Sequence, residues 1–242
     1  MGKIITVTGH PCCGKSVISL KLAQEIYGIT KKRVIILSPD INNPILGFLF
    51  PHRKEEELYS LGKILDKTDV YRDDVLKNIV TFKKMRDFGY LGYKLGENRY
   101  SYPEPTADKI YQFISCLKEI ADYIIADGTN DDENLISAMA RAEAKSAIQL
   151  ITPELKCVTY YASHPELLTF PKADTVIKVM NIKEKDMYLP TCEVERHFSN
   201  VKYILPYSFE LSKQAVSGTL PEKLSDDKFR KVLTEAAKAV IE

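Results

Sequence analysis

A short stretch near the N-terminus, GHPCCGKS from Gly9 to Ser16, has the spacing Gly-x-x-x-x-Gly-Lys-Ser. It lies between the apolar run KIITVT at 3–8 and the segment KSVISLKLAQEIYG at 15–28, in which apolar residues recur at helical spacing. Glycines at these two positions let the backbone curl so that its N–H groups face an anion, and a helix that starts there adds partial positive charge. The stretch therefore predicts a phosphate-binding P-loop between a strand and a helix.

Each position of this loop has an expected role. Lys15 is expected to contact the β- and γ-phosphates of a nucleotide, and the Ser16 hydroxyl is expected to ligate Mg²⁺, which prefers oxygen ligands. The other positions that we expect to surround the phosphates are Gly9, His10, Pro11, Cys12, Cys13, Gly14 and Val17. The loop thus predicts a nucleotide and Mg²⁺ as cofactors.

Two carboxylates stand at the ends of apolar runs, where a metal ion and an attacking water would need them. Asp127 closes YIIAD, as a Walker B aspartate does, and the polar GTNDD that follows is a candidate switch loop; Asp40 closes VIILSPD. The carboxyl ends of parallel strands meet at one edge of a sheet, where the P-loop also lies. We expect Lys15, Asp40 and Asp127 to be catalytic, and Ser16, Asp40 and Asp127 to ligate the metal. The alternative is that each aspartate only forms a turn beside a proline or glycine.

Short β-branched runs alternate with helical segments, a pattern typical of a parallel sheet covered by helices on both faces. Strands are expected at 3–8, 33–37, 90–95, 122–127, 146–152, 175–180 and 201–205. Helices are clearest at 15–28, 106–121 and 225–242, the last with Ser225 as N-cap, and residues 41–89 are expected to form short helices at the sheet edge. We predict one three-layer, doubly wound α/β domain over residues 1–242, with a mostly parallel sheet of about seven strands.

Composition limits the classes of function. A chain of 242 residues with a hydrophobic share of 45% can bury a substantial core, and a formal net charge of +1 gives no nucleic-acid signal. The five cysteines are scattered apart from one adjacent pair, so they predict neither a disulfide framework nor a zinc site. No apolar run is long enough to cross a membrane. These features favour a cytoplasmic protein.

In its order of elements the chain resembles the MinD/ParA group of ATPases, and most nearly their CpaE/TadZ-like pilus-assembly branch. The resemblance extends over most of the chain and rests on the P-loop, ADYIIAD at 121–127, Asn181 after TVIKVM, and the LPY turn at 205–207. In that family an Asn at this place contacts adenine, and a late strand ends in a proline-containing turn. The resemblance therefore implies that Asn181, Pro206 and Tyr207 bind the base of ATP or ADP.

The resemblance also implies slow hydrolysis of Mg-ATP, with the bound nucleotide controlling a homodimer or an unidentified protein partner in pilus assembly, secretion or cargo positioning. The implied location is the cytoplasm, or the inner face of the membrane through a partner. The chain departs from the family at three places, one of which is DGTND at 127–131, where DTPPG-like residues are common in the family. His10 stands where the family carries a signature lysine that reaches across the dimer, and Ser38 replaces the first aspartate of the switch I pair.

Two other functions remain open at this stage. A P-loop small-molecule kinase would share the loop and the sheet, but the arginines are scattered and no arginine-bearing lid is recognisable. A nucleotide-binding scaffold with little turnover would be consistent with His10 and Ser38. The apolar face of the last helix is diluted by alanine and its polar face carries both signs of charge, so we expect it to pack on the sheet and not on a membrane.

Overall fold

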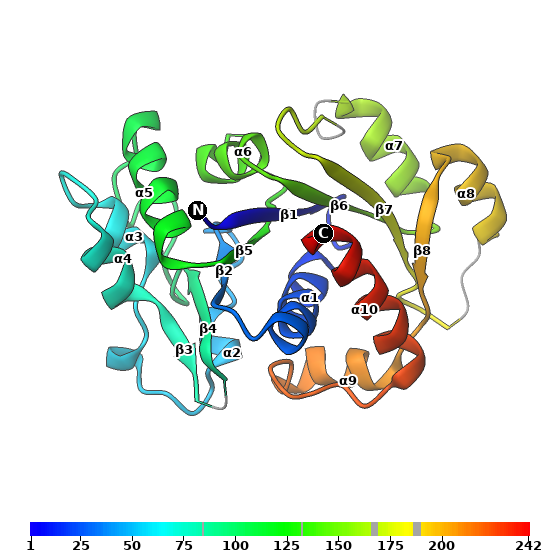
Figure 1. The fold of residues 1–242 in the computed structure, drawn as a ribbon, viewed down its shortest axis with the longest axis horizontal. Coiled ribbons are helices and arrows are strands. Elements are labelled where there is room, and N and C mark those ends of the chain that lie inside the picture. The colour runs from blue at the N-terminus through cyan, green and yellow to red at the C-terminus, as the bar shows by residue number, and fades with distance from the viewer. Residues whose placement is uncertain (84, 132, 166–168, 186–189) are drawn as a thin grey trace.

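The computed structural model describes residues 1–83, 85–131, 133–165, 169–185 and 190–242 (Figure 1). Its strands are β1 (Lys3–Gly9), β2 (Val34–Ser38), β3 (Val80–Phe82), β4 (Met85–Gly92), β5 (Tyr123–Asp127), β6 (Ser146–Ile151), β7 (Thr175–Asn181) and β8 (Val201–Leu205). Its longer helices are α1 (Lys15–Thr30), α5 (Ala107–Ile120), α6 (Leu135–Ala142), α7 (Leu155–Ser163), α8 (Thr191–Phe198), α9 (Phe209–Ser217) and α10 (Asp227–Ile241). The short helices are α2 (Leu46–Leu49), η1 (Glu55–Glu57), α3 (Leu61–Leu65) and α4 (Arg72–Asn78).

Across the described residues, eight strands form one sheet in the order β3-β4-β2-β5-β1-β6-β7-β8. Every neighbouring pair is parallel except β3 and β4. The central strands β1 and β5 are buried on both faces, which explains their continuous apolar sequences. The predicted three-layer, doubly wound architecture is confirmed, with eight strands in place of about seven.

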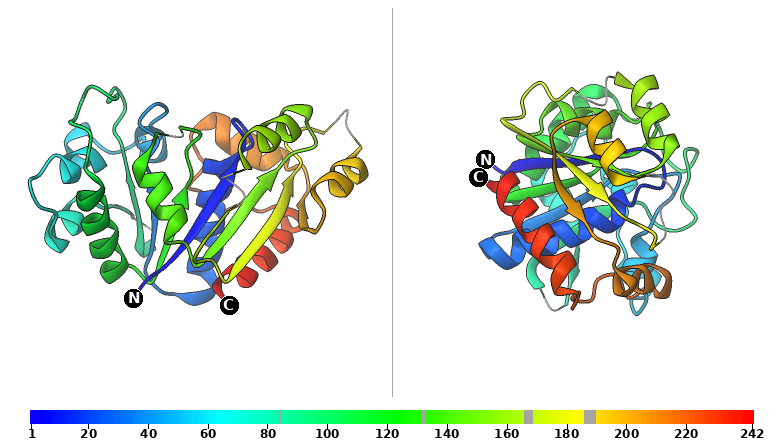
Figure 2. Two further views of the ribbon diagram at one scale, coloured as in Figure 1. Left: turned by 90° about the horizontal axis from the view of Figure 1, so that it is seen from above. Right: turned by 90° about the vertical axis from the view of Figure 1, so that its right-hand side faces the viewer.

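Helices cover both faces of the sheet (Figures 1 and 2). Helices α1 and α10 pack against each other and on one face, while α5 and α6 pack together on the other face. The first strand and the last helix are linked near the two ends of the chain, where the Lys3 side chain donates a hydrogen bond of 2.9 Å to the Ile241 carbonyl. Both ends of the chain lie at the amino edge of the sheet, opposite the carboxyl edge (Figure 2).

The edge formed by β3 and β4 corrects one expectation. A strand was expected at 90–95 and charged residues before it were assigned to an irregular segment, but β4 begins at Met85 and pairs with the unexpected β3. The first half of β4 is largely exposed, so its sequence lacks the apolar run that marks the central strands. Short helices do occupy part of 41–89, namely α2, η1, α3 and α4.

The last helix packs on the sheet, as expected. Phe229, Leu233 and Val240 of α10 are buried against α1 and the strands β6 to β8. Its N-cap is Asp226, whose carboxylate accepts a hydrogen bond of 3.2 Å from the Phe229 N–H, so the assignment of Ser225 was wrong by one residue. Among the described helices, none has the length and apolar character needed to cross a membrane.

Candidate functional site

The turn between β1 and α1 has the backbone that its glycines predict. Gly14 caps α1 with a φ of 93°, and Cys12 also adopts a positive φ of 61°. A side chain at Gly14 would come within 2.8 Å of the Asn181 amide nitrogen, so neighbouring packing as well as φ requires glycine there. A side chain at Gly9 would come within 2.5 Å of the Cys13 sulfur. The loop is therefore curled tightly against β6 and β7.

A cavity of about 620 Å³ opens above this loop at the carboxyl edge of the sheet. Eight residues expected at the site line it: Pro11, Cys12, Gly14, Lys15, Ser16, Val17, Asp40 and Asp127. The structure adds six lining residues that were not predicted individually, three of them in the candidate switch loop: Asn42, Asn43, Arg99, Gly128, Asn130 and Asp131. We call this space the P-loop cavity.

The Lys15 side chain folds back over its own loop. Its ammonium donates hydrogen bonds of 3.0 Å to the Gly9 and His10 carbonyls and one of 2.5 Å to Oδ1 of Asn130. These hydrogen bonds stabilise the charged ammonium of a residue that is only 9% exposed. An anion in the cavity would compete with them for the ammonium.

Asn130 lies in the candidate switch loop and links three elements. Its Oδ1 accepts from Lys15, while its Nδ2 donates 2.9 Å hydrogen bonds to the Gly9 carbonyl and the Tyr160 hydroxyl. The amide therefore ties the loop after β5 to the P-loop and to α7. Sequence reasoning assigned the loop a function but gave this residue none, because its partners are distant in the chain.

Asp127 is almost fully buried at the end of β5, where serine hydroxyls surround its carboxylate. Ser19 donates to Oδ1 and Ser38 to Oδ2, each at 3.3 Å. Burial raises the pKa of Asp127, while hydrogen bonds from Ser16, Ser38 and Ser19 and the charge of Lys15 oppose that rise. The carboxylate is thus held in one orientation beside Lys15 and Ser16, and its role as a Walker B aspartate stays a prediction.

Asp40 also lines the P-loop cavity, but its carboxylate is engaged by its own turn. Oδ1 accepts 3.0 Å hydrogen bonds from the backbone N–H groups of Asn42 and Asn43. The Asn43 side-chain amide reaches Oδ2 at 3.4 Å. Both interpretations of Asp40 from sequence, a site carboxylate and a turn residue, therefore have structural support, and its catalytic role stays a prediction.

His10 turns its side chain away from the P-loop cavity. The ring is fully buried, its Nε2 lies 2.7 Å from the Thr152 hydroxyl and 3.6 Å from a Glu154 carboxylate oxygen, and its Nδ1 has no partner among the described residues. Burial lowers the pKa of His10 to about 4, against the opposing charge of Glu154. The ring is neutral at pH 7, and only the His10 backbone faces Lys15.

This buried ring predicts a pH dependence of stability. The folded chain disfavours the protonated ring, so the unfolded chain binds more protons between about pH 4 and 6.5, and the free energy of unfolding should fall as pH falls through that range. His10→Gln should reduce this slope, whereas His52→Gln, at an exposed histidine, should leave it unchanged. Urea unfolding at a series of pH values measures it; equal slopes for parent and His10→Gln would contradict the assignment.

The residues expected to bind the base do not line the P-loop cavity. Asn181 ends β7 and is 7% exposed, and its amide donates a 2.9 Å hydrogen bond to the Cys13 carbonyl. Pro206 and Tyr207 follow β8, whose Leu205 pairs with Asn181. The structure therefore places Asn181 under the P-loop and the other two just beyond the neighbouring strand.

No protein-family model and no curated protein matches the chain. Solved structures do: a ParA family ATPase from Chlorobium tepidum is 13% identical with a TM-score of 0.76, covering 98% of both chains. The cell division ATPase MinD of Pyrococcus furiosus is 16% identical with a TM-score of 0.74, covering 100% of this chain and 99% of that one. MinD of Pyrococcus horikoshii complexed with Mg-ADP is 16% identical with a TM-score of 0.73, covering 98% and 95%. The chain thus has the P-loop fold of the MinD and ParA ATPases.

Proposed function

We propose that the chain is a P-loop ATPase that binds Mg-ATP, hydrolyses it slowly and uses the bound nucleotide to control association with itself or a partner. One observation carries the proposal. The ammonium of Lys15, the hydroxyl of Ser16 and the carboxylate of Asp127 converge on one open cavity at the start of α1. Together they supply an ammonium to bind phosphate, a hydroxyl oxygen to ligate a metal ion, and a carboxylate, all in one cavity.

The loop binds phosphate through its own backbone. The N–H groups at the start of α1 lack partners within the helix and carry its positive dipole end, so they favour an anion. Lys15 then exchanges its three protein acceptors for phosphate oxygens, which releases Asn130. Because Asn130 also contacts Gly9 and Tyr160, this exchange would reach the loop after β5 and α7.

The residues present fit Mg²⁺. No group of three or more His, Cys, Asp or Glu side chains in the described ranges could hold a metal by itself. The ion would therefore be held by the Ser16 hydroxyl together with phosphate oxygens of the nucleotide, with the carboxylates of Asp127 and Asp40 as further ligands. Mg²⁺ takes oxygen ligands and keeps several waters, which suits this set. When bound, Mg²⁺ would neutralise negative charge on the phosphate oxygens.

We place the chain nearest the CpaE/TadZ-like branch, in the cytoplasm or at the inner membrane face through a partner. Asn181, with Pro206 and Tyr207 beyond it, is proposed to favour adenine, since its amide can both donate and accept. The solved MinD complexed with Mg-ADP supports the choice of cofactor.

The buried His10 gives a reason to keep the scaffold with little turnover as a second candidate. A neutral, fully buried ring cannot do the work of a lysine that reaches into a partner's nucleotide site.

Light-scattering mass in ADP and in a non-hydrolysable ATP analogue tests whether the bound nucleotide controls self-association. We expect the mass to double in the analogue; a monomer in both nucleotides would remove self-association from the proposal.

Asp40 supplies a further prediction about turnover. Asp40→Ala should retain ATP affinity within about threefold and lose most phosphate release, because a carboxylate that orients water acts mainly in the transition state. Asp40→Asn keeps an acceptor for the Asn42 and Asn43 N–H groups and removes only the charge. It should lose turnover similarly, while Asp69→Ala, at an exposed aspartate elsewhere, should not. Normal phosphate release from Asp40→Asn would mean that Asp40 only stabilises its turn and has no catalytic role.

A further inference from the structure

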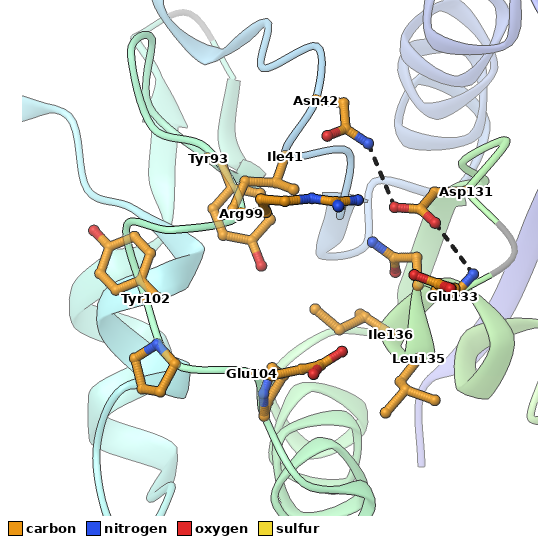
Figure 3. A pocket seen from close by; sticks show the side chains of 13 residues that line it. Ile41, Asn42, Tyr93, Arg99, Tyr102, Glu104, Asp131, Glu133, Leu135 and Ile136 are labelled. Carbon is orange, nitrogen blue, oxygen red and sulfur yellow. Dashed lines mark hydrogen bonds between the residues drawn. The ribbon is translucent and has the colours of Figure 1, made fainter.

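A second cavity adjoins the P-loop cavity at the same edge of the sheet (Figure 3). It has a volume of about 290 Å³, near the lower end of the roughly 300–1,000 Å³ typical of small-molecule sites. Both Tyr93 and Tyr102 line it, so we call it the tyrosine cavity. It shares Asn42, Arg99 and Asp131 with the P-loop cavity, so that an occupant would lie beside the proposed nucleotide.

The hydroxyl of Tyr93 points into this space without a partner (Figure 3). The residue is only 7% exposed, and its hydroxyl makes no hydrogen bond to any part of the chain that the structure describes. Burial, with the nearby Glu97 and Tyr102, raises the pKa of Tyr93 to about 12, so the hydroxyl stays protonated at pH 7. The hydroxyl is not one of the fully buried unpaired atoms, so it reaches the cavity and is available to donate to or accept from a ligand there.

The wall around Tyr93 is already fixed. Glu97 accepts hydrogen bonds of 2.6 Å from Ser60, 2.6 Å from the Tyr102 hydroxyl and 2.7 Å from the Lys94 N–H. The Tyr102 ring lies against Gly62, where any side chain would come within 2.1 Å of it. The Tyr102 hydroxyl is thus committed to Glu97, and its ring is left to face the cavity (Figure 3). Little ordering would accompany binding.

The charges that line the tyrosine cavity are mostly negative. Glu104, Asp131 and Glu133 contribute three carboxylates, whereas Arg99 contributes one guanidinium at the side shared with the P-loop cavity. Glu104 and Glu133 are exposed, and their side chains form no ion pair or hydrogen bond with any described residue. Figure 3 shows the Glu104 carboxylate and the apolar Ile136 facing the same space as the Tyr93 hydroxyl.

We propose that the tyrosine cavity binds a small organic molecule that carries a protonated primary or secondary amine. The amine donates to the Tyr93 hydroxyl and the Glu104 carboxylate, while the apolar body packs between the Tyr102 ring and Ile136 (Figure 3). Aromatic rings attract cations through their faces, and a carboxylate strengthens the hydrogen bonds of an ammonium. An anionic ligand would instead meet three carboxylates, so it is disfavoured.

This inference goes beyond the proposed ATPase and does not depend on it. The test is a titration of the nucleotide-free full chain with 2-phenylethylamine, followed by NMR of the isoleucine methyl groups. The matched ligand is 2-phenylethanol, which has the same apolar frame without the charge. We expect saturable shifts at Ile41 and Ile136, which both line the cavity, and binding about tenfold tighter for the amine than for the alcohol.

Three variants locate the amine. Glu104→Gln should weaken the binding of 2-phenylethylamine about tenfold and Tyr93→Phe about threefold, since each removes one hydrogen-bond partner. Glu57→Gln removes an exposed carboxylate outside both cavities and should change nothing. The proposal is wrong if no saturable shift occurs at Ile136, if the alcohol binds as tightly as the amine, or if Glu104→Gln and Glu57→Gln weaken binding alike.

Discussion

Lys15→Ala is expected to cost about 2–4 kcal/mol of Mg-ATP binding or transition-state stabilisation, the largest effect of any single change at the site. The ammonium lies among backbone carbonyl groups and is almost buried. Water in its place would therefore stabilise a phosphate group much less. The alanine variant loses the phosphate contact and also leaves Asn130 without its cationic partner. Calorimetric titration with Mg-ATP measures the loss.

The matched control for Lys15 is Lys213→Ala on α9. Lys213 is exposed, does not line the P-loop cavity and makes no hydrogen bond or ion pair within the described residues, so the variant removes one positive charge outside that cavity. It should bind nucleotide as the parent does. If Lys15→Ala, with an unchanged far-UV circular dichroism spectrum, bound Mg-ATP as tightly as Lys213→Ala, the P-loop assignment would be wrong.

Asp127→Asn is expected to lower the rate of phosphate release by roughly 100-fold or more while nucleotide affinity changes less than tenfold. Asparagine has nearly the same shape, so Ser19 and Ser38 keep one oxygen acceptor, but the negative charge beside Ser16 and Lys15 is gone. That charge matters most where a metal and developing charge on the phosphate must be held in place. Single-turnover phosphate release measures the effect.

Asp131→Asn provides the comparison for Asp127. Asp131 also lines the P-loop cavity, yet it is partly exposed and accepts from Asn42 at a long 3.4 Å. We expect this variant to retain most of the activity. Equal losses for the two variants would mean that cavity charge in general, and not the buried carboxylate of Asp127, controls turnover.

Local sequence was sufficient for the part of the site that is contiguous. The strand, loop and helix from Lys3 to Thr30 follow one another without interruption, and Asp127 ends a run that is buried on both faces. These features depend on residues within one or two turns of each other, and they were predicted correctly. The antiparallel edge of β3 and β4 was not, because β3 has only three residues and the first half of β4 is largely exposed.

The rest of the site depends on contacts between distant residues. Asn130 reaches Gly9 across 121 positions, and His10 meets Thr152 across 142. Arg99 joins two cavities from a loop after β4 in which nothing marks it as a site residue. Such placements follow from the order of the strands in the sheet, which a single sequence does not specify.

Phosphate release from Mg-ATP by the purified chain, without any added acceptor, tests the central claim most directly. Asp127→Asn serves as the blank for contaminating ATPases. The proposed function predicts slow release that clearly exceeds the blank and disappears when Mg²⁺ is chelated. Release no faster than that of Asp127→Asn would contradict hydrolysis at this site and leave at most a nucleotide-binding scaffold.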